Sequence, residues 1–461
     1  MFVDELTALL GKRVSIATIV REQHSRGESW HPPGLPDVVC YPRTTAEVSE
    51  ILKISARHGL PVVPFGAGSS IEGQVHAIHG GISLDMTAMN AILRVSTEDL
   101  DATVEAGVTR KQLNAKINPR GVAFFVDPGA DATMGGMAST RASGTTSIRY
   151  GTMRENVLGL TAVLADGQIM HTGSRARKSA AAYDLTHLLI GAEGTLGVIT
   201  ELTVKLHPLP EAVCAAVCPF ATLEGAVRTV IETIQLGVPV ARVELLDEAA
   251  LDAVNRRSHT AYATLPTLFF EFHGVSEQHV QDHTAIVRTL AEEHGAHSFE
   301  WATRLDDREK LWQARHDAYY AALALRPGAR GWTTDVCVPI SQLADCILQA
   351  KRDHQHAPFP LPLVGHVGDG NFHLMYVLDP ASESELAAAQ QLSTQLVQRA
   401  LAMGGTCTGE HGVGTGKLAH LEAEHGLNAL NAMRAIKHAL DPDNRMNPGK
   451  TIALCKTPGK E

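Results

Sequence analysis

The 461-residue sequence contains neither a long apolar run nor the apolar core of a signal peptide. No hydrophobic run approaches the roughly 20 residues that a transmembrane helix needs. Residues 1–20 contain early acidic residues and lack the apolar core of a signal peptide, so secretion by that route is not expected. We expect a cytoplasmic protein and leave open a peripheral association with the inner membrane.

Positive charge and metal-type cysteine spacing are also missing. A formal net charge of −10 argues against nucleic acid as a main partner, and the sequence contains no polybasic patch for a membrane surface. Cys214 and Cys218 lie three residues apart, but no second pair accompanies them. We therefore expect reduced and mostly buried thiols rather than a zinc knuckle. The seven cysteines are Cys40, Cys214, Cys218, Cys337, Cys346, Cys407 and Cys455.

A chain of this length exceeds what one hydrophobic core usually fills, so two domains or more are expected. A regular pattern begins with a strand at residues 38–41, a helix that Thr45 can cap and that ends near His58 before Gly59, and a strand at residues 60–64. This β-α-β unit ends in a glycine-rich loop at residues 64–73.

Neither of two common nucleotide fingerprints fits this chain. The Rossmann pattern fails because the third glycine position after Gly66 and Gly68 is Ile71. A P-loop fails as well, since the run ending at Lys417 begins with His411 instead of glycine. Two readings of the loop remain: a structural tight turn, or backbone amides that face a pyrophosphate.

Two more glycine clusters favour a bound ligand. Residues 127–152 are rich in small and hydroxylated side chains, which make a poor core but can line a bulky ligand. A third cluster occupies residues 191–200.

The stretch from Gly365 to His373 contains two histidines separated by Gly-Asp-Gly-Asn. Asp369-Gly370 is a favoured two-residue type I′ turn, which would place His366 opposite His373 with Cβ atoms about 5 Å apart. Both imidazoles could then bind one metal. The alternative is a glycine-rich hairpin with two polar residues at its base.

Together, the Pro-Phe-Gly-Ala-Gly-Ser-Ser and Gly-Ala-Glu-Gly-Thr-Leu-Gly runs and the C-terminal motifs resemble the vanillyl-alcohol-oxidase/p-cresol-methylhydroxylase family of flavoproteins, in particular its branch of D-lactate dehydrogenases and glycolate oxidases. The resemblance covers about residues 35–452. It implies an α+β protein with an arm at residues 1–34 and a two-subdomain FAD-binding domain at residues 35–212. An α+β cap at residues 213–461, entered through a hinge at residues 208–210, would carry the metal site and a flavin-contacting tail.

The same resemblance implies which residues hold FAD. Backbone amides of the first loop would bind the pyrophosphate, the second cluster would follow the ribityl chain and isoalloxazine, and the third would close over the dinucleotide. Some family members bind flavin covalently, but the sequence singles out no residue for that role. The expected residues are Phe65, Gly66, Ala67, Gly68, Ser69, Ser70, Pro128, Gly129, Thr133, Gly135, Gly136, Ser139, Ser143, Gly144, Tyr150, Glu193, Gly194, Gly197, Ile199 and Asn447.

The run from Thr408 to Lys417 supplies further chemistry. Glu410 would complete a metal set with His366 and His373, and two imidazoles with one carboxylate suit zinc, manganese or iron. Four glycines in residues 409–416 argue against a helix here. By resemblance, the neighbouring His411 would be the general base.

Arg315 resembles the family's partner of the substrate carboxylate, a role that suits the arginine fork. Its alternative is a surface salt bridge. Relatives acting on dicarboxylates place a lysine near Thr333, which cannot form that ion pair, so the sequence favours a monocarboxylate.

The sequence thus predicts FAD-dependent oxidation of a D-2-hydroxy acid, with D-lactate the first choice. A metal would bind the substrate, and hydride would pass to the flavin. Alternatives are a D-2-hydroxyglutarate or glycolate dehydrogenase, a non-redox synthase of the same fold, and a flavin-binding scaffold. The electron acceptor could be a quinone, a cytochrome, an electron-transfer flavoprotein or oxygen, and a homodimer is left open.

Overall fold

The computed structural model describes residues 2–454 and divides them into two compact units. Unit 1 comprises residues 2–143, 151–209 and 410–454, and unit 2 comprises residues 144–150 and 210–409. The boundary at Leu209 falls within the predicted hinge. The C-terminal tail groups with unit 1 rather than with the expected cap, because the backbone N–H of Val62 donates to Arg445 O at 2.8 Å and Val62 forms a parallel bridge with Met446.

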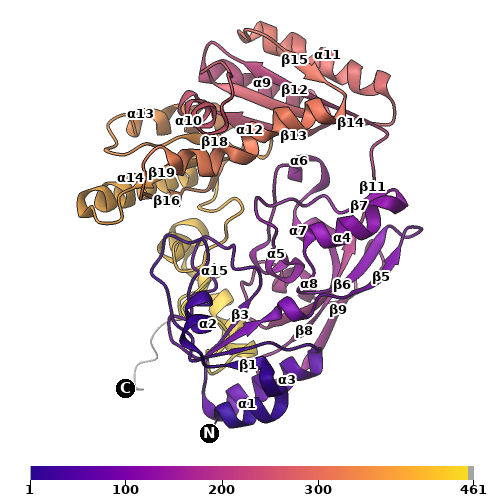
Figure 1. Cartoon of the computed structure of the whole chain (residues 1–461), viewed down its shortest axis with the longest axis vertical. Coiled ribbons are helices and arrows are strands. Elements are labelled where there is room, and N and C mark those ends of the chain that lie inside the picture. Colours follow the sequence, from indigo (N-terminus) through magenta and orange to yellow (C-terminus); the bar gives the residue numbers. More distant parts are fainter. Residues whose placement is uncertain (1, 455–461) are drawn as a thin grey trace. The chain divides into compact units, whose positions relative to one another are not determined.

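A small sheet with the order β1-β2-β4-β3 opens unit 1. Its strands are β1 (Val14–Ser15), β2 (Val38–Cys40), β4 (Ile82–Asp85) and β3 (Val62–Phe65), and the last three run parallel. Helix α3 (Thr45–His58) joins β2 to β3 and packs against α1 (Phe2–Leu10) (Figure 1). Thr44, not the expected Thr45, caps α3, since its side chain accepts from Glu47 N at 3.1 Å. The helix ends at Gly59, whose φ is 63°.

The second sheet of unit 1 is antiparallel, with the order β5-β6-β10-β8-β9. Its core holds Leu160, Leu202 and Phe124 beside helix α5 (Met134–Thr140). The strands are β5 (Ile92–Ser96), β6 (Asp101–Glu105), β10 (Val198–Lys205), β8 (Val157–Val163) and β9 (Ile169–Gly173).

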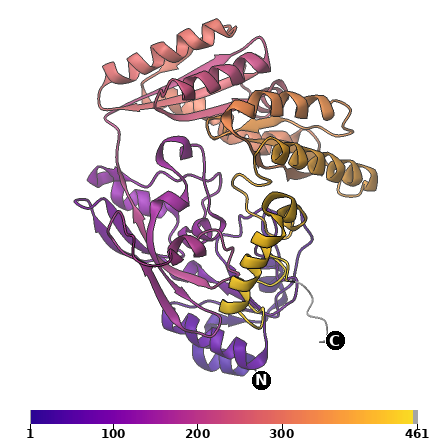
Figure 2. The ribbon, with the colours of Figure 1, turned by 180° about the vertical axis from the view of Figure 1, so that it is seen from behind.

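Helix α15 (Leu421–Leu440) supplies the last long element of unit 1 (Figure 2). Gly426 interrupts its helical geometry with φ 75°. The buried Nζ of Lys437 donates to Thr195 O at 2.7 Å and Met446 O at 2.8 Å, which fixes the end of this helix to the third glycine cluster.

Unit 2 is an α+β body built on the sheet β15-β12-β14-β13-β18-β19-β16. Helices α10 (Glu248–Ser258) and α12 (Leu305–Ala324) pack together, as do α9 (Leu223–Gln235) and α11 (Glu277–Glu293), while α13 (Leu343–Asp353) contacts α14 (Glu383–Ala402). The strands are β15 (Glu300–Ala302), β12 (Ala212–Pro219), β14 (Thr267–Gly274), β13 (Val240–Leu246), β18 (Leu363–Gly365), β19 (Asn371–Leu378) and β16 (Arg330–Thr333).

Two short strands of unit 2, β16 and β17, follow each other closely in the chain. Strand β16 ends at Thr333, and β17 begins at Val336 and ends at Cys337. Thr334 and Asp335 lie between them and are buried. The Thr334 hydroxyl oxygen accepts from Leu374 N at 2.9 Å, so a side chain replaces a ladder partner between the two strands.

The hairpin prediction correctly placed the two histidine side chains on one face, but its turn type and strand register are wrong. Val364, not His366, lies opposite His373. A type I′ turn needs positive φ at two residues, and only Gly370 has it, with φ 82°. The chain instead makes a 3-10 turn over Val367–Asp369 before Gly370. A register shift of two residues preserves the face of each side chain, and the His366 and His373 ring centroids lie 5.4 Å apart.

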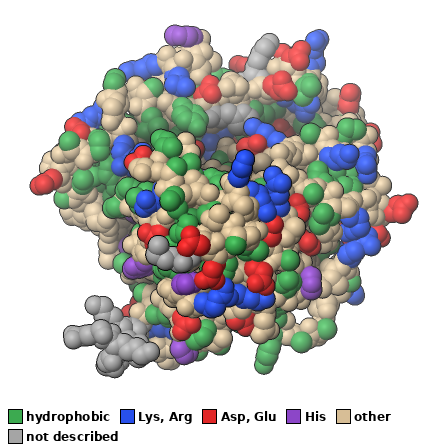
Figure 3. Space-filling model, turned by 60° about the horizontal axis from the view of Figure 1, so that its bottom comes forward, with side chains coloured by type: hydrophobic (Ala, Val, Ile, Leu, Met, Phe, Trp, Pro, Cys, Tyr) green, Lys and Arg blue, Asp and Glu red, His purple; other side chains and the backbone are tan. Residues whose placement is uncertain are grey.

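No helix within residues 2–454 is long and apolar enough to cross a membrane. On the face that Figure 3 displays, positive and negative side chains are interspersed.

Gly370 gives the first testable prediction. A Cβ at this position would lie 2.1 Å from Val338 O in addition to the strain of its positive φ. We expect Gly370→Ala to lower the free energy of unfolding by more than about 1 kcal/mol in urea titrations. Gly328→Ala is the matched control, because its φ is 81° and its Cβ would meet nothing within 4 Å. Equal losses in the two variants would contradict the contact with Val338.

Candidate active site

His366 and His373 form a buried imidazole pair in unit 2 whose tautomers are set by their neighbours. His366 follows β18, His373 belongs to β19, and they are 8% and 5% exposed. The Nδ1 of His366 lies 2.7 Å from Glu244 Oε1, and the Nδ1 of His373 lies 2.8 Å from Thr334 O. Carboxylate and carbonyl oxygens only accept hydrogen bonds, so each neutral ring carries its proton on Nδ1 and its lone pair on Nε2. This donor set fits a divalent metal.

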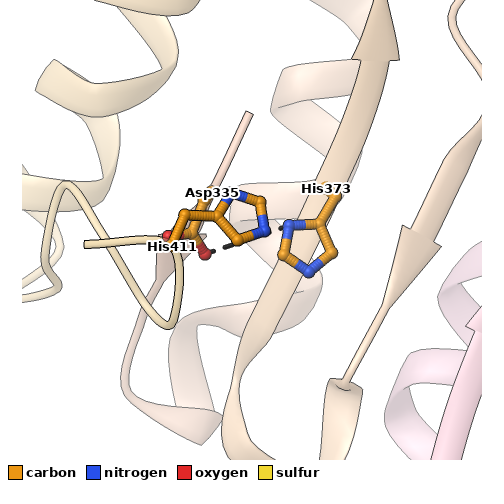
Figure 4. A group of neighbouring side chains, drawn as sticks. All are labelled: Asp335, His373 and His411. Carbon is orange, nitrogen blue, oxygen red and sulfur yellow. Dashed lines mark ion pairs between the residues drawn. The ribbon is translucent and has the colours of Figure 1, made fainter. Parts of the chain in front are cut away.

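Two carboxylates that the sequence analysis did not select lie next to the imidazoles of His366 and His373. Glu244 on β13 is 0% exposed, and Asp335 between β16 and β17 is 2% exposed. The closest polar atoms of Asp335 and His373 are 3.9 Å apart; these side chains are drawn in Figure 4 with His411 of unit 1. Asp335 accepts from Asn371 Nδ2 at 2.8 Å and from the Thr408 hydroxyl at 2.7 Å. A carboxylate within a mostly apolar strand sequence was the signal that could have identified Glu244.

Arg315 on α12 forms a part-buried ion pair. Its Nε donates to Glu244 Oε2 at 2.6 Å, and the two side chains are 17% and 0% exposed. The alternative of a surface salt bridge therefore does not describe this residue. Its Nε serves Glu244, and the terminal nitrogens of the guanidinium are the donors that a substrate carboxylate could use.

Glu410 and His411 lie in an irregular segment of unit 1, as the glycine content predicted. Ser143 Oγ donates to Glu410 Oε2 at 2.8 Å, and His411 Nε2 lies 3.5 Å from Glu410 Oε1. Gln74 Nε2 donates to His411 O at 2.8 Å. The Glu410 carboxylate and the backbone oxygen of His411 thus each accept a hydrogen bond from a residue of unit 1.

The carboxylate of Glu193 holds the backbone of this segment through hydrogen bonds. Its carboxylate, in a side chain 4% exposed, accepts from Val413 N at 2.7 Å, Gly414 N at 2.8 Å and Thr451 Oγ1 at 2.7 Å. Burial raises the pKa of Glu193, and these hydrogen bonds oppose that rise. The Nδ2 of Asn447 donates to the backbone carbonyl of Glu193 at 2.6 Å, so the expected flavin residue Asn447 also ties the tail to this cluster.

The first glycine loop presents unused backbone donors. Within residues 2–454, no acceptor takes up the amides of Gly66, Ala67, Gly68, Ser69 and Ser70, and the buried hydroxyl of Ser70 makes no hydrogen bond. Gly68 has φ 70°, and a Cβ on Gly66 would lie 2.4 Å from the Thr133 hydroxyl. Consecutive free amides on a bend form an anion-binding concavity, which fits the pyrophosphate of FAD.

The expected flavin-binding glycines differ in whether packing requires a glycine at their position. Gly135, Gly194 and Gly197 are required by packing, since a Cβ there would lie 2.6 Å from Ala106, 2.9 Å from Pro64 and 2.9 Å from Val163 O respectively. Gly129 is exposed, and a Cβ there would meet nothing within 4 Å, so packing does not require a glycine at this position.

Several expected flavin residues have structural hydrogen bonds or belong to other parts of the fold. The side chain of Thr133 caps α5, and the Ser139 hydroxyl donates to the backbone within α5. Phe65 and Ile199 are buried in strands. Gly144 and Tyr150 belong to unit 2, whereas Pro128, Gly136 and Ser143 belong to unit 1.

Tyr150 begins a buried hydrogen-bonded chain in unit 2. Its hydroxyl lies 2.6 Å from His273 Nδ1, and His273 Nε2 lies 2.7 Å from Glu271 Oε1. The carboxylate accepts, so His273 is protonated on Nε2 and Tyr150 donates to Nδ1. Burial would raise the pKa of Glu271, but Arg242 at 3.3 Å and His273 outweigh it and lower that pKa to about 2.

Comparison with protein-family models identifies two matching regions. Residues 209–451 match the C-terminal domain of FAD linked oxidases, and residues 36–173 match an FAD binding domain.

Curated relatives span most of the chain. A probable mitochondrial D-lactate dehydrogenase of Danio rerio is 48% identical over 96% of this chain and 90% of its own length. A mitochondrial D-lactate dehydrogenase [cytochrome] of Arabidopsis thaliana is 45% identical over 91% of this chain and 74% of its own. The glycolate oxidase subunit GlcD of Bacillus subtilis is 35% identical over 91% of this chain and 89% of its own.

Solved structures confirm the expected fold class. A p-cresol methylhydroxylase with substrate bound superposes with a TM-score of 0.77 at 18% identity, covering 98% of this chain and 96% of that one. An alkyldihydroxyacetonephosphate synthase gives 0.76 at 20% identity, covering 97% and 85%. At such identities the likeness concerns the fold alone.

The Glu271 chain predicts a pH dependence of stability. The pKa of this carboxyl falls from an ordinary 4.5 to about 2 on folding, so the ionised form stabilises the fold above about pH 4.5. That contribution, about 3 kcal/mol, is lost as the pH falls toward 2. Urea unfolding followed by tryptophan fluorescence should show a shallower slope in Glu271→Gln than in the wild type, because other carboxyls with a lowered pKa, such as Glu244 and Asp101, keep their own contributions. The exposed Glu224→Gln is the control, and an unchanged slope in Glu271→Gln would refute the assignment.

Proposed function

The chain belongs to the FAD-linked oxidase family, and on that premise we propose that it oxidises D-lactate to the 2-oxo acid with FAD as the electron acceptor. The choice of D-lactate as substrate rests on the sequence identity of 40–48% to several D-lactate dehydrogenases. The tautomers of His366 and His373 support a metal-assisted reaction.

The proposed FAD site begins at the five unused amides of Gly66–Ser70, which would bind the pyrophosphate. Gly129 and the neighbouring small residues would leave room for the rest of the cofactor. Bound FAD supplies a two-electron acceptor for the hydrogen on C2 of the substrate. The protein positions that substrate and removes its hydroxyl proton.

The proposed metal ligands are the Nε2 atoms of His366 and His373, with the Glu410 carboxylate as the third ligand expected from the sequence. Glu244 and the Thr334 carbonyl keep both lone pairs on Nε2. A divalent metal held by this set, zinc or manganese with iron as a third choice, supplies a Lewis acid that lowers the pKa of the substrate hydroxyl.

Two further residues would act on the substrate. The terminal guanidinium nitrogens of Arg315 would bind its carboxylate, while the Nε of this residue remains on Glu244. The imidazole of His411 would accept the hydroxyl proton, because the ordinary pKa of histidine, about 6.5, suits a base at neutral pH.

Glycolate is the second candidate substrate, on the strength of the 35% identity to a glycolate oxidase subunit. A cytochrome acceptor is named for the Arabidopsis relative and is one of the acceptors proposed here. The names of the Danio and Arabidopsis relatives also place them in mitochondria, so a cytoplasmic location for this chain stays a prediction.

His411→Ala tests the proposed base. The Gln74 contact uses the backbone oxygen of His411, which alanine retains, so FAD should stay bound. Flavin reduction by D-lactate should slow by about 100-fold or more, which is the usual contribution of a positioned base. Anaerobic stopped-flow absorbance measures this rate. Bleaching at the wild-type rate would exclude His411 as the base.

Removal of the metal tests the proposed ligand set. After dialysis against a chelator, anaerobic reduction of the flavin by D-lactate should cease and should return on addition of zinc or manganese. The same assay with L-lactate, glycolate and D-2-hydroxyglutarate determines the substrate. Full activity in protein shown by elemental analysis to be metal-free would contradict the metal, and no bleaching by any 2-hydroxy acid would contradict the function.

A further inference from the structure

Glu244 has a position that neither the metal nor the substrate assignment explains. Its side chain lies on β13, a strand whose other residues are mostly apolar, and it is 0% exposed. An isolated buried carboxylate is costly, so such a residue is retained where its charge is fully used. Each of its two oxygens contacts a different residue of the proposed site.

The two contacts are short and come from separate elements. Oε1 lies 2.7 Å from Nδ1 of His366, directly after β18, and Oε2 accepts from Nε of Arg315 on α12 at 2.6 Å. One rigid carboxylate therefore fixes the distance between a proposed metal ligand and the proposed carboxylate-binding arginine. All three residues belong to unit 2.

We infer that Glu244 is a positioning residue that couples metal binding to recognition of the substrate carboxylate, an inference that rests on the proposed function. Through Oε1 it keeps the proton of His366 on Nδ1 and the lone pair on Nε2. Through Oε2 it engages the inner nitrogen of Arg315, so that only the terminal nitrogens face a ligand. The hydroxyl and the carboxylate of a 2-hydroxy acid are on adjacent carbons, so the metal and the Arg315 guanidinium must lie at a fixed separation to bind both.

Glu244→Gln preserves the shape of the side chain but can accept through only one oxygen. Its NH₂ group must face either His366 or Arg315. Facing His366, it donates to Nδ1 and moves the ring proton to Nε2, which removes the ligand lone pair. Facing Arg315, it opposes an N–H group and releases the guanidinium. Either arrangement therefore disturbs the metal ligand His366 or the carboxylate-binding Arg315.

We expect Glu244→Gln to bind manganese or zinc about 10- to 100-fold more weakly, as measured by titration of the chelator-treated, FAD-loaded protein with the metal alone. At saturating metal, the KM for D-lactate should rise at least about tenfold, with a smaller change in kcat. In a double-mutant cycle, Glu244→Gln and Arg315→Gln should affect KM non-additively, because both act through the same ion pair.

Asp247→Asn is the matched control for burial. Asp247 is also 0% exposed and ion-paired, to Lys351 at 2.6 Å, and its Oδ1 accepts from Ala250 N and Leu363 N. Its loss should lower stability while leaving metal affinity unchanged. If Glu244→Gln does not fold, Glu244→Asp keeps the charge but is one carbon shorter and cannot hold both partners, so it should show the same losses to a lesser degree.

The outcomes separate this inference from the function on which it rests. A wild-type protein that neither binds metal nor reduces its flavin with D-lactate would overturn both. A wild type that does both, with folded Glu244 variants whose metal affinity and KM stay within twofold of it, would overturn the coupling alone.

Discussion

A buried carboxylate whose oxygens are all engaged cannot move without leaving donors unpaired, and Glu193 imposes this constraint on unit 1. It holds the amides of Val413 and Gly414 and the hydroxyl of Thr451. Gly412 is forced by the same contact, since a Cβ there would lie 2.2 Å from Glu193 Oε1. The loop bearing His411 is therefore determined by a residue more than two hundred positions earlier in the chain.

Unit 2 also contains buried carboxylates that accept hydrogen bonds from their neighbours. Glu244, Asp335 and Glu271 are buried acids: Glu244 contacts the imidazole of His366, Glu271 contacts that of His273, and Asp335 accepts from Asn371. Burying a charge is destabilising unless it is paired and hydrogen-bonded, so these acids constrain their partners as strongly as the partners constrain them. The sheet supplies the rigid frame, because Glu244, Glu271 and His373 lie on strands β13, β14 and β19.

Local features of the fold could be predicted from the sequence because their causes are local. Gly59 ends α3, the glycine content of residues 409–416 excludes a helix, and the two histidines share a face. The predicted turn was wrong because Asp369 lacks the positive φ that it requires, and the backbone there pairs with another segment: Val338 N donates to Gly370 O at 3.0 Å. The roles of Glu244 and Glu193 were not predictable for the same reason: a buried acid reveals its purpose only through partners that are distant in sequence.

The fold by itself specifies little of the reaction. It is shared, at 18–20% identity, with a methylhydroxylase and a synthase whose names describe different chemistry. What the fold supplies is a set of rigid strand ends on which side chains can be placed, and function follows from the residues placed there. In this chain the residues proposed for that role are two histidines, whose Nδ1 atoms contact Glu244 and the Thr334 carbonyl, and an arginine whose Nε donates to Glu244. For the metal and the hydroxy acid proposed above, a site that fixes the proton positions of its ligands beforehand would need little reorganisation on binding.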